Sequence, residues 1–428
     1  MNYCLENGIG TITGNGTIEG PKAASSAAIW VNAANQTLTI DGNVTVKGGE
    51  STNTNNDNAT AANIYNGKLV INNGTFISGI DASGNNSPAI YLTPRAGETA
   101  VLEINGGVFK SVSGNAEFLI NCDDGATSRC QISIKGGTFY GFNPADNNAD
   151  GAHTNYVAEG YVVIKNGGEY TVVKAHEVTD ETSLKKAITS SKTAPVLVNS
   201  TIELESSYLS LTNGYNLVVG EKGKITPSSS YRSDVGETIS TANKTGTVNI
   251  SGSGSIEGPS NSTDGNGACA IEIMGSNTSS TKLTVNIYGN LTVKGGSGGE
   301  ANNAVTIING IANIYGGYFY AGLDKNSDPS EKVAVIYLRP GWKQNATLNI
   351  YDGVFECAGD PAFLINCLDS SVDANKCTIN VTGGIFVGFD PSNSVADKIN
   401  GKNANWVPDG YVSKEITYNG KQAWEVTK

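Results

Sequence analysis

The chain has 428 residues, and its 28 lysines and arginines against 40 aspartates and glutamates give a net charge of −12. This acidic balance argues against a nucleic-acid partner, because neutralising phosphates requires clustered cations. No stretch approaches the roughly 18 apolar residues of a membrane-spanning helix, so no membrane insertion is expected, and the opening MNYCLENGIG lacks the features of a signal peptide.

The first half of the chain consists of short apolar runs between turn-forming residues. Glycine is abundant at 53 residues, and Asn, Ser and Thr are frequent, which predicts an all-β protein with many turns. Apolar runs begin near Ala27, Ala61, Ser87 and Glu117. A spacing of about 30 residues is typical of a solenoid, in which each turn of the chain stacks on the previous one.

Each predicted turn pairs one alternating run with a glycine corner and a phenylalanine. In VLEINGGVF (residues 101–109), alternation places Leu102, Ile104 and Phe109 on the inward side. The glycine pair permits a sharp corner, because glycine has no Cβ to clash at positive φ. Stacking of equivalent turns predicts two ladders of rings in the core, made of Phe76, Phe109 and Phe139 and of Phe319, Phe355 and Phe386.

The second half repeats the first. GNGTIEGP (14–21) matches GSGSIEGP (252–259), EFLINC (117–122) matches AFLINC (362–367), and KGGTFYGFNPAD (135–146) matches TGGIFVGFDPSN (382–393). This pattern indicates a tandem duplication with changes in loop length. The predicted fold class is therefore all-β, with two tandem right-handed parallel β-helix domains at residues 1–175 and 176–428.

The second predicted domain has a cap at each end. The segment TDETSLKKAITS (179–190) is the one convincing helix, with Thr179 as its expected cap and with Leu184, Ala187 and Ile188 on its apolar face. A hairpin turning at Asn419-Gly420 is expected over residues 410–427. The first domain has a similar hairpin over 160–174 but no counterpart of the helix, so we expect an upstream segment or a docking partner at its start.

Seven cysteines are present, and four of them fall at matching places in the two halves. Cys122 and Cys130 in the first half correspond to Cys367 and Cys377 in the second. Each pair either closes a loop or consists of buried free thiols, because cysteine also behaves as a small core residue. The spacings match no zinc site.

Few residues suggest chemistry, and we assign no catalytic residue and no cofactor. Asp123 and Asp124, just after an apolar strand, are the candidates if the protein is an enzyme, since paired carboxylates serve as acid and nucleophile. Asp81 and Asp324 are expected to cap turns. The two histidines, His153 and His176, are interpreted as solvated loop residues.

Carbohydrate binding requires exposed aromatic rings, and Trp342 and Tyr140 are the candidates. Calcium could use the loops NTNNDN (53–58) and NPADNNAD (143–150), which are rich in oxygen ligands, but no calcium motif is present and no metal ligand is assigned.

The repeated turns resemble right-handed parallel β-helix proteins, the group that holds pectate-lyase-like enzymes and phage tailspikes. The phrases GGTFYGFNPADN and NYVAEGYVV are similar to β-helix proteins of gut Bacteroidales and their phages. Leucine-rich repeats lack support because their signature is missing, and a pair of β-sandwiches would require more two-residue hairpin turns.

The resemblance implies a non-catalytic structural or adhesive rod, such as a phage tail fibre, tailspike or head appendage located in the virion. The glycine, histidine and arginine phrases of the family's hydrolases and lyases do not occur here. The alternatives are a polysaccharide-active lyase or glycoside hydrolase, and a secreted adhesin at the cell surface. Expected partners are other copies of the chain, as in a homotrimer, other virion proteins, or host-surface polysaccharide.

Overall fold

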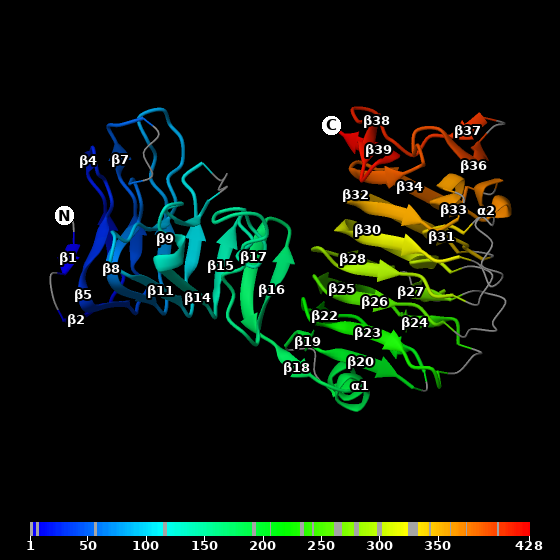
Figure 1. Cartoon of the computed structure of the whole chain (residues 1–428), viewed down its shortest axis with the longest axis horizontal. Helices are drawn as coiled ribbons and strands as arrows, with labels where there is room; N and C mark the ends of the chain where they lie inside the picture. The colour runs from blue at the N-terminus through cyan, green and yellow to red at the C-terminus, as the bar shows by residue number, and fades with distance from the viewer. Residues whose placement is uncertain are drawn as a thin grey trace. The chain divides into compact units, whose positions relative to one another are not determined.

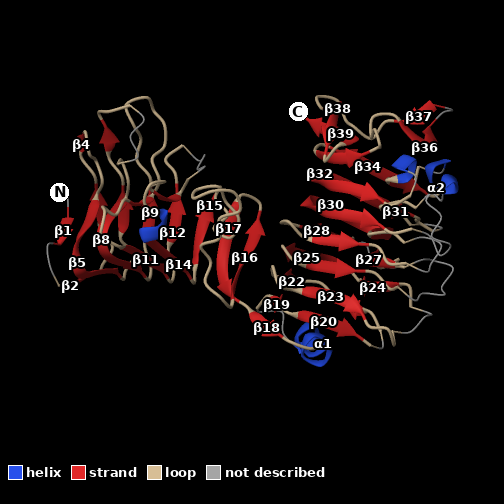
Figure 2. Ribbon diagram, viewed as in Figure 1, coloured by secondary structure: helices blue, strands red, loops and turns tan. Residues whose placement is uncertain are grey.

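A computed structural model describes the chain except for a set of short segments, and it divides the chain into two compact units, Met1–Ala175 (unit 1) and His176–Lys428 (unit 2). The described residues are 3–5, 8–54, 58–113, 118–190, 194–205, 207–231, 235–241, 244–260, 268–277, 282–297, 302–323, 333–341, 344–359, 361–373, 375–399 and 402–428. Both units are parallel β-solenoids, and the two α-helices, α1 (Glu181–Ser190) and α2 (Asp369–Asp373), are short (Figure 2).

Unit 1 has three faces of parallel strands. The first face contains β1 (Tyr3–Leu5), the start of β5 (Ile29–Ile40), the start of β8 (Ala62–Ile71), β10 (Ile90–Leu92) and β13 (Ile120–Cys122). The second face contains β2 (Ile9–Ile12), the ends of β5 and β8, β11 (Ala100–Ile104) and β14 (Cys130–Ile134). The third face contains β3 (Thr17–Glu19), β6 (Thr45–Lys47), β9 (Thr75–Ile77), β12 (Val108–Lys110) and β15 (Gly137–Tyr140).

Smaller elements complete unit 1. They are the corner pair β4 (Lys22–Ala23) and β7 (Glu50–Ser51), the 3-10 helix η1 (Thr127–Arg129), and the hairpin of β16 (Tyr161–Asn166) and β17 (Glu169–Lys174). Strand β17 pairs antiparallel with β15 and so covers the last edge of the third face.

Unit 2 repeats the three faces with more turns, and Figure 1 shows its strands stacked from α1 to the hairpin at the C-terminus. The first face contains β21 (Leu209–Ser210), β24 (Glu237–Ser240), β27 (Cys269–Met274), the start of β30 (Val305–Ala321), β31 (Ile336–Leu338) and β33 (Ile365–Cys367). The second face contains β18 (His176–Val178), β19 (Val196–Val198), β22 (Asn216–Val219), β25 (Gly246–Gly252), β28 (Leu283–Ile287), the middle of β30, the start of β32 (Ala346–Cys357) and β34 (Cys377–Val381). The third face contains β20 (Thr201–Leu204), β23 (Lys224–Pro227), β26 (Ser255–Glu257), β29 (Thr292–Lys294), the ends of β30 and β32, and β35 (Gly384–Val387).

The remaining elements of unit 2 lie near its C-terminus. They are η2 (Pro361–Phe363), the pair β36 (Ser394–Ile399) and β37 (Lys402–Ala404), and the hairpin of β38 (Val412–Tyr418) and β39 (Lys421–Thr427). Asn419 and Gly420, between β38 and β39, both have positive φ, which suits a type I′ turn.

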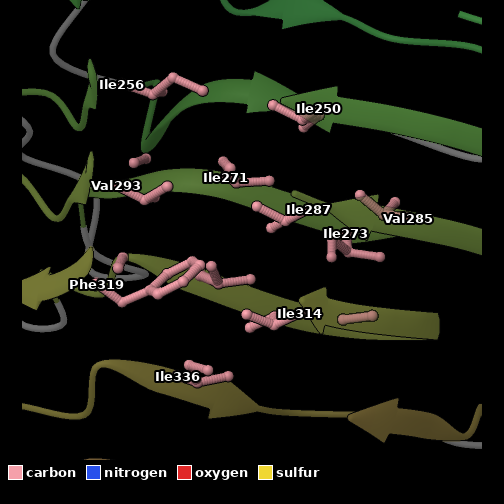
Figure 3. Close-up of a cluster of buried hydrophobic side chains, with 14 of the residues drawn as sticks. Ile250, Ile256, Ile271, Ile273, Val285, Ile287, Val293, Ile314, Phe319 and Ile336 are labelled. Atoms are coloured by element: carbon pink, nitrogen blue, oxygen red, sulfur yellow. The ribbon is translucent and has the colours of Figure 1, made fainter. Parts of the chain in front are cut away.

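The core of each unit is built from inward side chains stacked in register. Figure 3 shows this in unit 2, where Ile250, Ile287 and Ile314 form one column and Ile256, Val293 and Phe319 form another. The predicted phenylalanine ladders are confirmed. The ring centroids of Phe76, Phe109 and Phe139 are 5.2 and 4.7 Å apart, and those of Phe319, Phe355 and Phe386 are 5.1 and 4.9 Å apart.

Helix α1 packs against β18, β19 and β20 at the start of unit 2. Its apolar residues Leu184, Ala187 and Ile188 are buried, as the sequence predicts. The expected cap is wrong by one residue. Asp180 Oδ1 accepts the Ser183 N–H at 2.8 Å and Ser183 Oγ accepts the Asp180 N–H at 3.2 Å, so Asp180 rather than Thr179 satisfies the free N–H groups of the first turn.

Candidate functional site

The outward side of the second face of unit 2 is the most regular surface that the structure describes. It carries three rows of side chains on β25, β28, β30, β32 and β34, because every second residue of a strand points outward. We call it the amide–tyrosine face, and its rows are Thr247, Thr284, Ile311, Thr347 and Thr378; Asn249, Asn286, Asn313, Asn349 and Asn380; and the stacked tyrosines Tyr288, Tyr315 and Tyr351.

The asparagines form a continuous hydrogen-bonded row. Asn249 Nδ2 donates to Asn216 Oδ1 at 2.7 Å, and Asn286, Asn313, Asn349 and Asn380 each donate in the same way to the preceding asparagine at 2.8–2.9 Å. An amide has two N–H donors and two acceptor sites on its oxygen. Each asparagine within the row therefore keeps one donor and one acceptor site for other contacts.

The tyrosines stack beside this row. The ring centroids of Tyr288 and Tyr315 are 4.8 Å apart, and those of Tyr315 and Tyr351 are 4.7 Å apart, with nearly parallel planes. Burial raises the pKa of Tyr315, whereas Tyr351 at the end of the row is 45% exposed. Tyr288 and Tyr315 are half-buried.

The amide–tyrosine face carries no charged residue at the positions named above, although the chain has a net charge of −12. The equivalent face of unit 1 is charged. There, Glu103 accepts hydrogen bonds from Lys68 at 2.8 Å and from Lys135 at 3.4 Å, and the Lys68 contact lowers the pKa of Glu103. The two units therefore differ in surface chemistry on matching strands.

Unit 1 contains a pocket of about 270 Å³ at the end of its third face. Its charged lining residues pair across neighbouring turns, with Lys22 at 2.8 Å from Glu50 and Lys47 at 2.7 Å from Glu19. The Lys22–Glu50 contact raises the pKa of Lys22 and lowers that of Glu50. These charges bridge successive turns, as do Lys224 and Glu257 in unit 2 at 2.7 Å.

The predicted catalytic candidates lie in a turn after β13. Asp123 Oδ1 accepts the Gly125 N–H at 3.1 Å, and the carbonyl of Asp123 accepts the Ala126 N–H at 2.7 Å. Asp124, the next residue, is exposed. The structure thus places Asp123 in a local turn, where its carboxylate holds the backbone.

Of the two carbohydrate candidates, only Tyr140 lies among the described residues. Tyr140 is the last residue of β15 in unit 1 and is 38% exposed, and a hydrogen bond with Glu169 raises its pKa. Trp342 lies outside the described residues. The sequence missed the amide–tyrosine face, although a signal was available, since the triplet Asn-Ile-Tyr recurs at 286–288, 313–315 and 349–351.

Asp81 and His153 are held by contacts within their own loops. Asp81 accepts the Ser83 and Asn85 N–H groups at 2.8 Å, which confirms its predicted role as a turn cap, while Asp324 is outside the described residues. His153 is an exposed loop residue, as predicted, and contacts Asp146 at 2.9 Å. The loop prediction for His176 is wrong, because this exposed residue begins β18 and pairs with Val196 of β19.

Of the two predicted calcium loops, only 143–150 is fully described. In loop 143–150, Asn143 Oδ1 accepts the Ala145 N–H at 3.1 Å, and loop 53–58 is only partly described. Among the described residues, no group of three His, Cys, Asp or Glu side chains is placed to hold a metal.

Two carboxylates lie at matching places in the two units, half-buried Asp150 in unit 1 and buried Asp397 in unit 2. Asp150 accepts the Cys122 N–H at 3.2 Å and the Tyr156 hydroxyl at 2.7 Å. Asp397, 2% exposed, accepts the Cys367 N–H at 3.2–3.3 Å. Unit 2 has three more residues than unit 1 between this aspartate and the aromatic residue that follows it, Trp406 in place of Tyr156.

Unit 2 has no tyrosine at the place of Tyr156, whose hydroxyl donates a hydrogen bond to Asp150 in unit 1. Trp406 takes that place, and its Nε1–H is buried with no acceptor among the described residues. Burial raises the pKa of Asp397 to about 6, from an ordinary value of 3.8. Asp397 therefore binds its proton more tightly in the folded state than in the unfolded state.

We expect this proton to stabilise unit 2 at low pH. The stabilisation is fully present below about pH 4 and is lost as the pH rises through about 6, a change of about 2–3 kcal/mol. Asp397→Asn removes the titration, so its unfolding free energy relative to the wild type should increase over that pH range. Denaturant titrations at several pH values measure this difference, and a constant difference would contradict the assignment.

No protein-family model, curated protein or solved structure matches this chain. Among the described residues, no helix is long and apolar enough to cross a membrane.

Proposed function

We propose that this protein is a non-catalytic structural and adhesive module that contacts an uncharged host-surface polysaccharide through the amide–tyrosine face. The proposed setting is a phage virion, in a tail fibre, tailspike or head appendage assembled in the bacterial cytoplasm. The likeness of its repeated phrases to β-helix proteins of phages of gut Bacteroidales supports that setting. Other copies of the chain, as in a homotrimer, or other virion proteins are the proposed structural partners.

The observation that carries the proposal is the periodic surface of unit 2, whose named rows contain no charged residue. Its amides recur on five successive turns and its phenol groups on three, with a spacing of about 4.8 Å along the axis and about 7 Å along the strand. Sugar hydroxyls both donate and accept hydrogen bonds, so they match the free donor and acceptor sites of the asparagine row.

A periodic surface favours a periodic ligand. Each repeat of a polysaccharide can make the same contacts with successive turns, and several weak contacts on one chain combine into useful affinity. The absence of charge from the named positions suits a neutral polymer, because a charged ligand would leave its charge unpaired there. A folded protein partner has an aperiodic surface and would use only part of this regularity.

We expect Tyr351→Ala to weaken binding of a neutral polysaccharide about tenfold, which corresponds to about 1.4 kcal/mol. The change removes the most exposed ring of the row. Affinity electrophoresis in gels containing dextran, galactomannan or xyloglucan measures the binding. The matched control is Asn105→Ala, at the same place in unit 1, which should bind as the wild type does.

Two results would overturn the proposal. If the polysaccharide slows the migration of Tyr351→Ala as much as that of Asn105→Ala, the ligand uses another surface. If no neutral polysaccharide slows the migration of the wild type, the proposed ligand class is wrong. Release of oligosaccharides or unsaturated products by the wild type, abolished in Asp123→Asn with Asp124→Asn, would instead support the enzyme alternative. Self-association that is lost in Tyr351→Ala would identify the face as a contact between copies.

A further inference from the structure

Each unit carries two cysteines at its last corner between the first and second faces. In unit 1, Cys122 is the last residue of β13 and Cys130 is the first of β14. In unit 2, Cys367 ends β33 and Cys377 begins β34. All of these cysteines are free thiols in the structure.

The thiol pair is retained although the corner between its members differs. Unit 1 crosses the corner through the 3-10 helix Thr127–Arg129, whereas unit 2 uses the longer segment that contains α2. Loop length and helix type have therefore changed between the two copies, while both ends of the corner remain cysteine. The pair itself is thus the common feature of these corners.

The two thiols of each pair belong to the same apolar cluster at the edge of the core. Cys122 and Cys367 are each 1% exposed, and Cys130 and Cys377 are partly buried against the same apolar clusters. A hydrogen bond with Cys130 raises the pKa of Cys122, and a hydrogen bond with Cys377 does the same for Cys367.

Backbone contacts in unit 1 support this placement. Cys130 Sγ lies 3.5 Å from the carbonyl oxygen of Ala126 and 3.9 Å from that of Leu92. Leu92 is the register partner of Cys122 on the neighbouring strand, so the Cys130 sulfur lies beside the strand that pairs with Cys122.

A carboxylate fixes the buried member of each pair. Asp150 accepts the N–H of Cys122, and Asp397 accepts the N–H of Cys367. These hydrogen bonds hold the end of the first-face strand in place, so the partly buried thiol meets a fixed partner.

We infer that each of these corners is a disulfide-forming site, which joins Cys122 to Cys130 and Cys367 to Cys377 when a low-molecular-weight disulfide serves as the oxidant. The thiolate of Cys130 attacks the oxidant, forms a mixed disulfide and releases one small thiolate. The thiolate of Cys122 then attacks the Cys130 sulfur and releases the second small thiolate. Each cysteine gives one proton to solvent and each released thiolate takes one up, so two protein thiols become one disulfide while the oxidant becomes two thiols.

The other described cysteines provide internal references. Cys269 is buried on β27, and Cys357 Sγ contacts the carbonyl oxygen of Gly359 at 3.5 Å. The second step, attack by the buried thiol, should be slow, because the raised pKa of Cys122 and of Cys367 leaves little thiolate at neutral pH. We therefore expect a lasting cross-link rather than a rapid switch. The inference about the disulfides does not depend on whether unit 2 binds a glycan.

The test is to incubate the folded full chain with oxidised glutathione, block the remaining thiols by alkylation, and map disulfides in a non-reducing digest by mass spectrometry. We expect both bridges, and we expect the oxidised protein to melt about 5–10 °C above the reduced one, as for a short closed loop. Cys130→Ser and Cys377→Ser should each lose one bridge and part of the shift, and Cys269→Ser should lose neither. Dithiothreitol should reverse the shift.

The inference fails if the four corner thiols of the folded chain stay reduced while the chain unfolded in denaturant forms disulfides. It also fails if the bridges include Cys269 or Cys357, or if the bridged protein melts no higher than the reduced protein. Should Cys130→Ser fold poorly, Cys130→Ala serves for the same mapping.

Discussion

Replacing Phe355 by alanine is expected to lower the free energy of unfolding of unit 2 by about 3–5 kcal/mol. Phe355 is fully buried and stacks between Phe319, at 5.1 Å, and Phe386, at 4.9 Å. Truncation therefore removes two ring contacts and leaves a cavity in a core whose neighbours are held in register by β32. Denaturant unfolding measures the loss, and hydrogen exchange shows whether it is confined to unit 2.

A matched control lies on the same strand. Tyr351 also belongs to β32 and stacks on a neighbour, but it is 45% exposed. Tyr351→Ala should cost less than about 1 kcal/mol, because solvent already covers much of the ring. Equal losses for Tyr351→Ala and Phe355→Ala would show that Phe355 does not occupy the shared core.

Gly49→Ala is the second change with a large expected effect, a loss of about 3 kcal/mol or more in the stability of unit 1. Gly49 is buried at the corner after the third face. A Cβ there would lie 2.0 Å from the carbonyl oxygen of Pro21 and 2.7 Å from the carbonyl carbon of Gly20, in the turn below. Both neighbours are backbone, so the stacked turns must separate to make room.

The control for this change is Gly16→Ala, which also lies in unit 1. A Cβ at Gly16 would have nothing within 4 Å. Thermal unfolding should therefore show a large decrease in melting temperature for Gly49→Ala and little change for Gly16→Ala. A melting temperature for Gly49→Ala equal to that of the wild type would mean that the turns are not in contact at this corner.

The sequence predicted the core better than the surface. Phe109 and Phe355 could be assigned to ladders because alternation places them inward and each ladder needs only an equivalent residue in the next turn. Asp397 could not be predicted as buried, because its burial depends on β36 packing across the end of β33, and these segments are distant along the chain. Short-range patterns contain no information about such contacts.

The candidate site was not predicted at all. Tyr140 and Trp342 were chosen because they are aromatic residues near glycines, whereas the site consists of asparagines and tyrosines that gain significance only as rows. A single Asn249 or Tyr315 looks like any other polar or aromatic strand residue. Its role depends on which residues occupy the same position one turn before and one turn after.

The amino-acid sequence by itself determined the solenoid turn, the duplication and the inward ladders, because alternation and glycine corners act over a few residues. Only the tertiary structure decided which outward residues share a row. The triplet Asn-Ile-Tyr at 63–65 lies at the first face of unit 1, where Asn63 is buried and Tyr65 stacks on Trp30 at 5.3 Å. The same triplet at 313–315 lies on the second face of unit 2. The physical reason is that the corners between faces accommodate loops of different length. The face that a triplet occupies is therefore set by the stacking of whole turns.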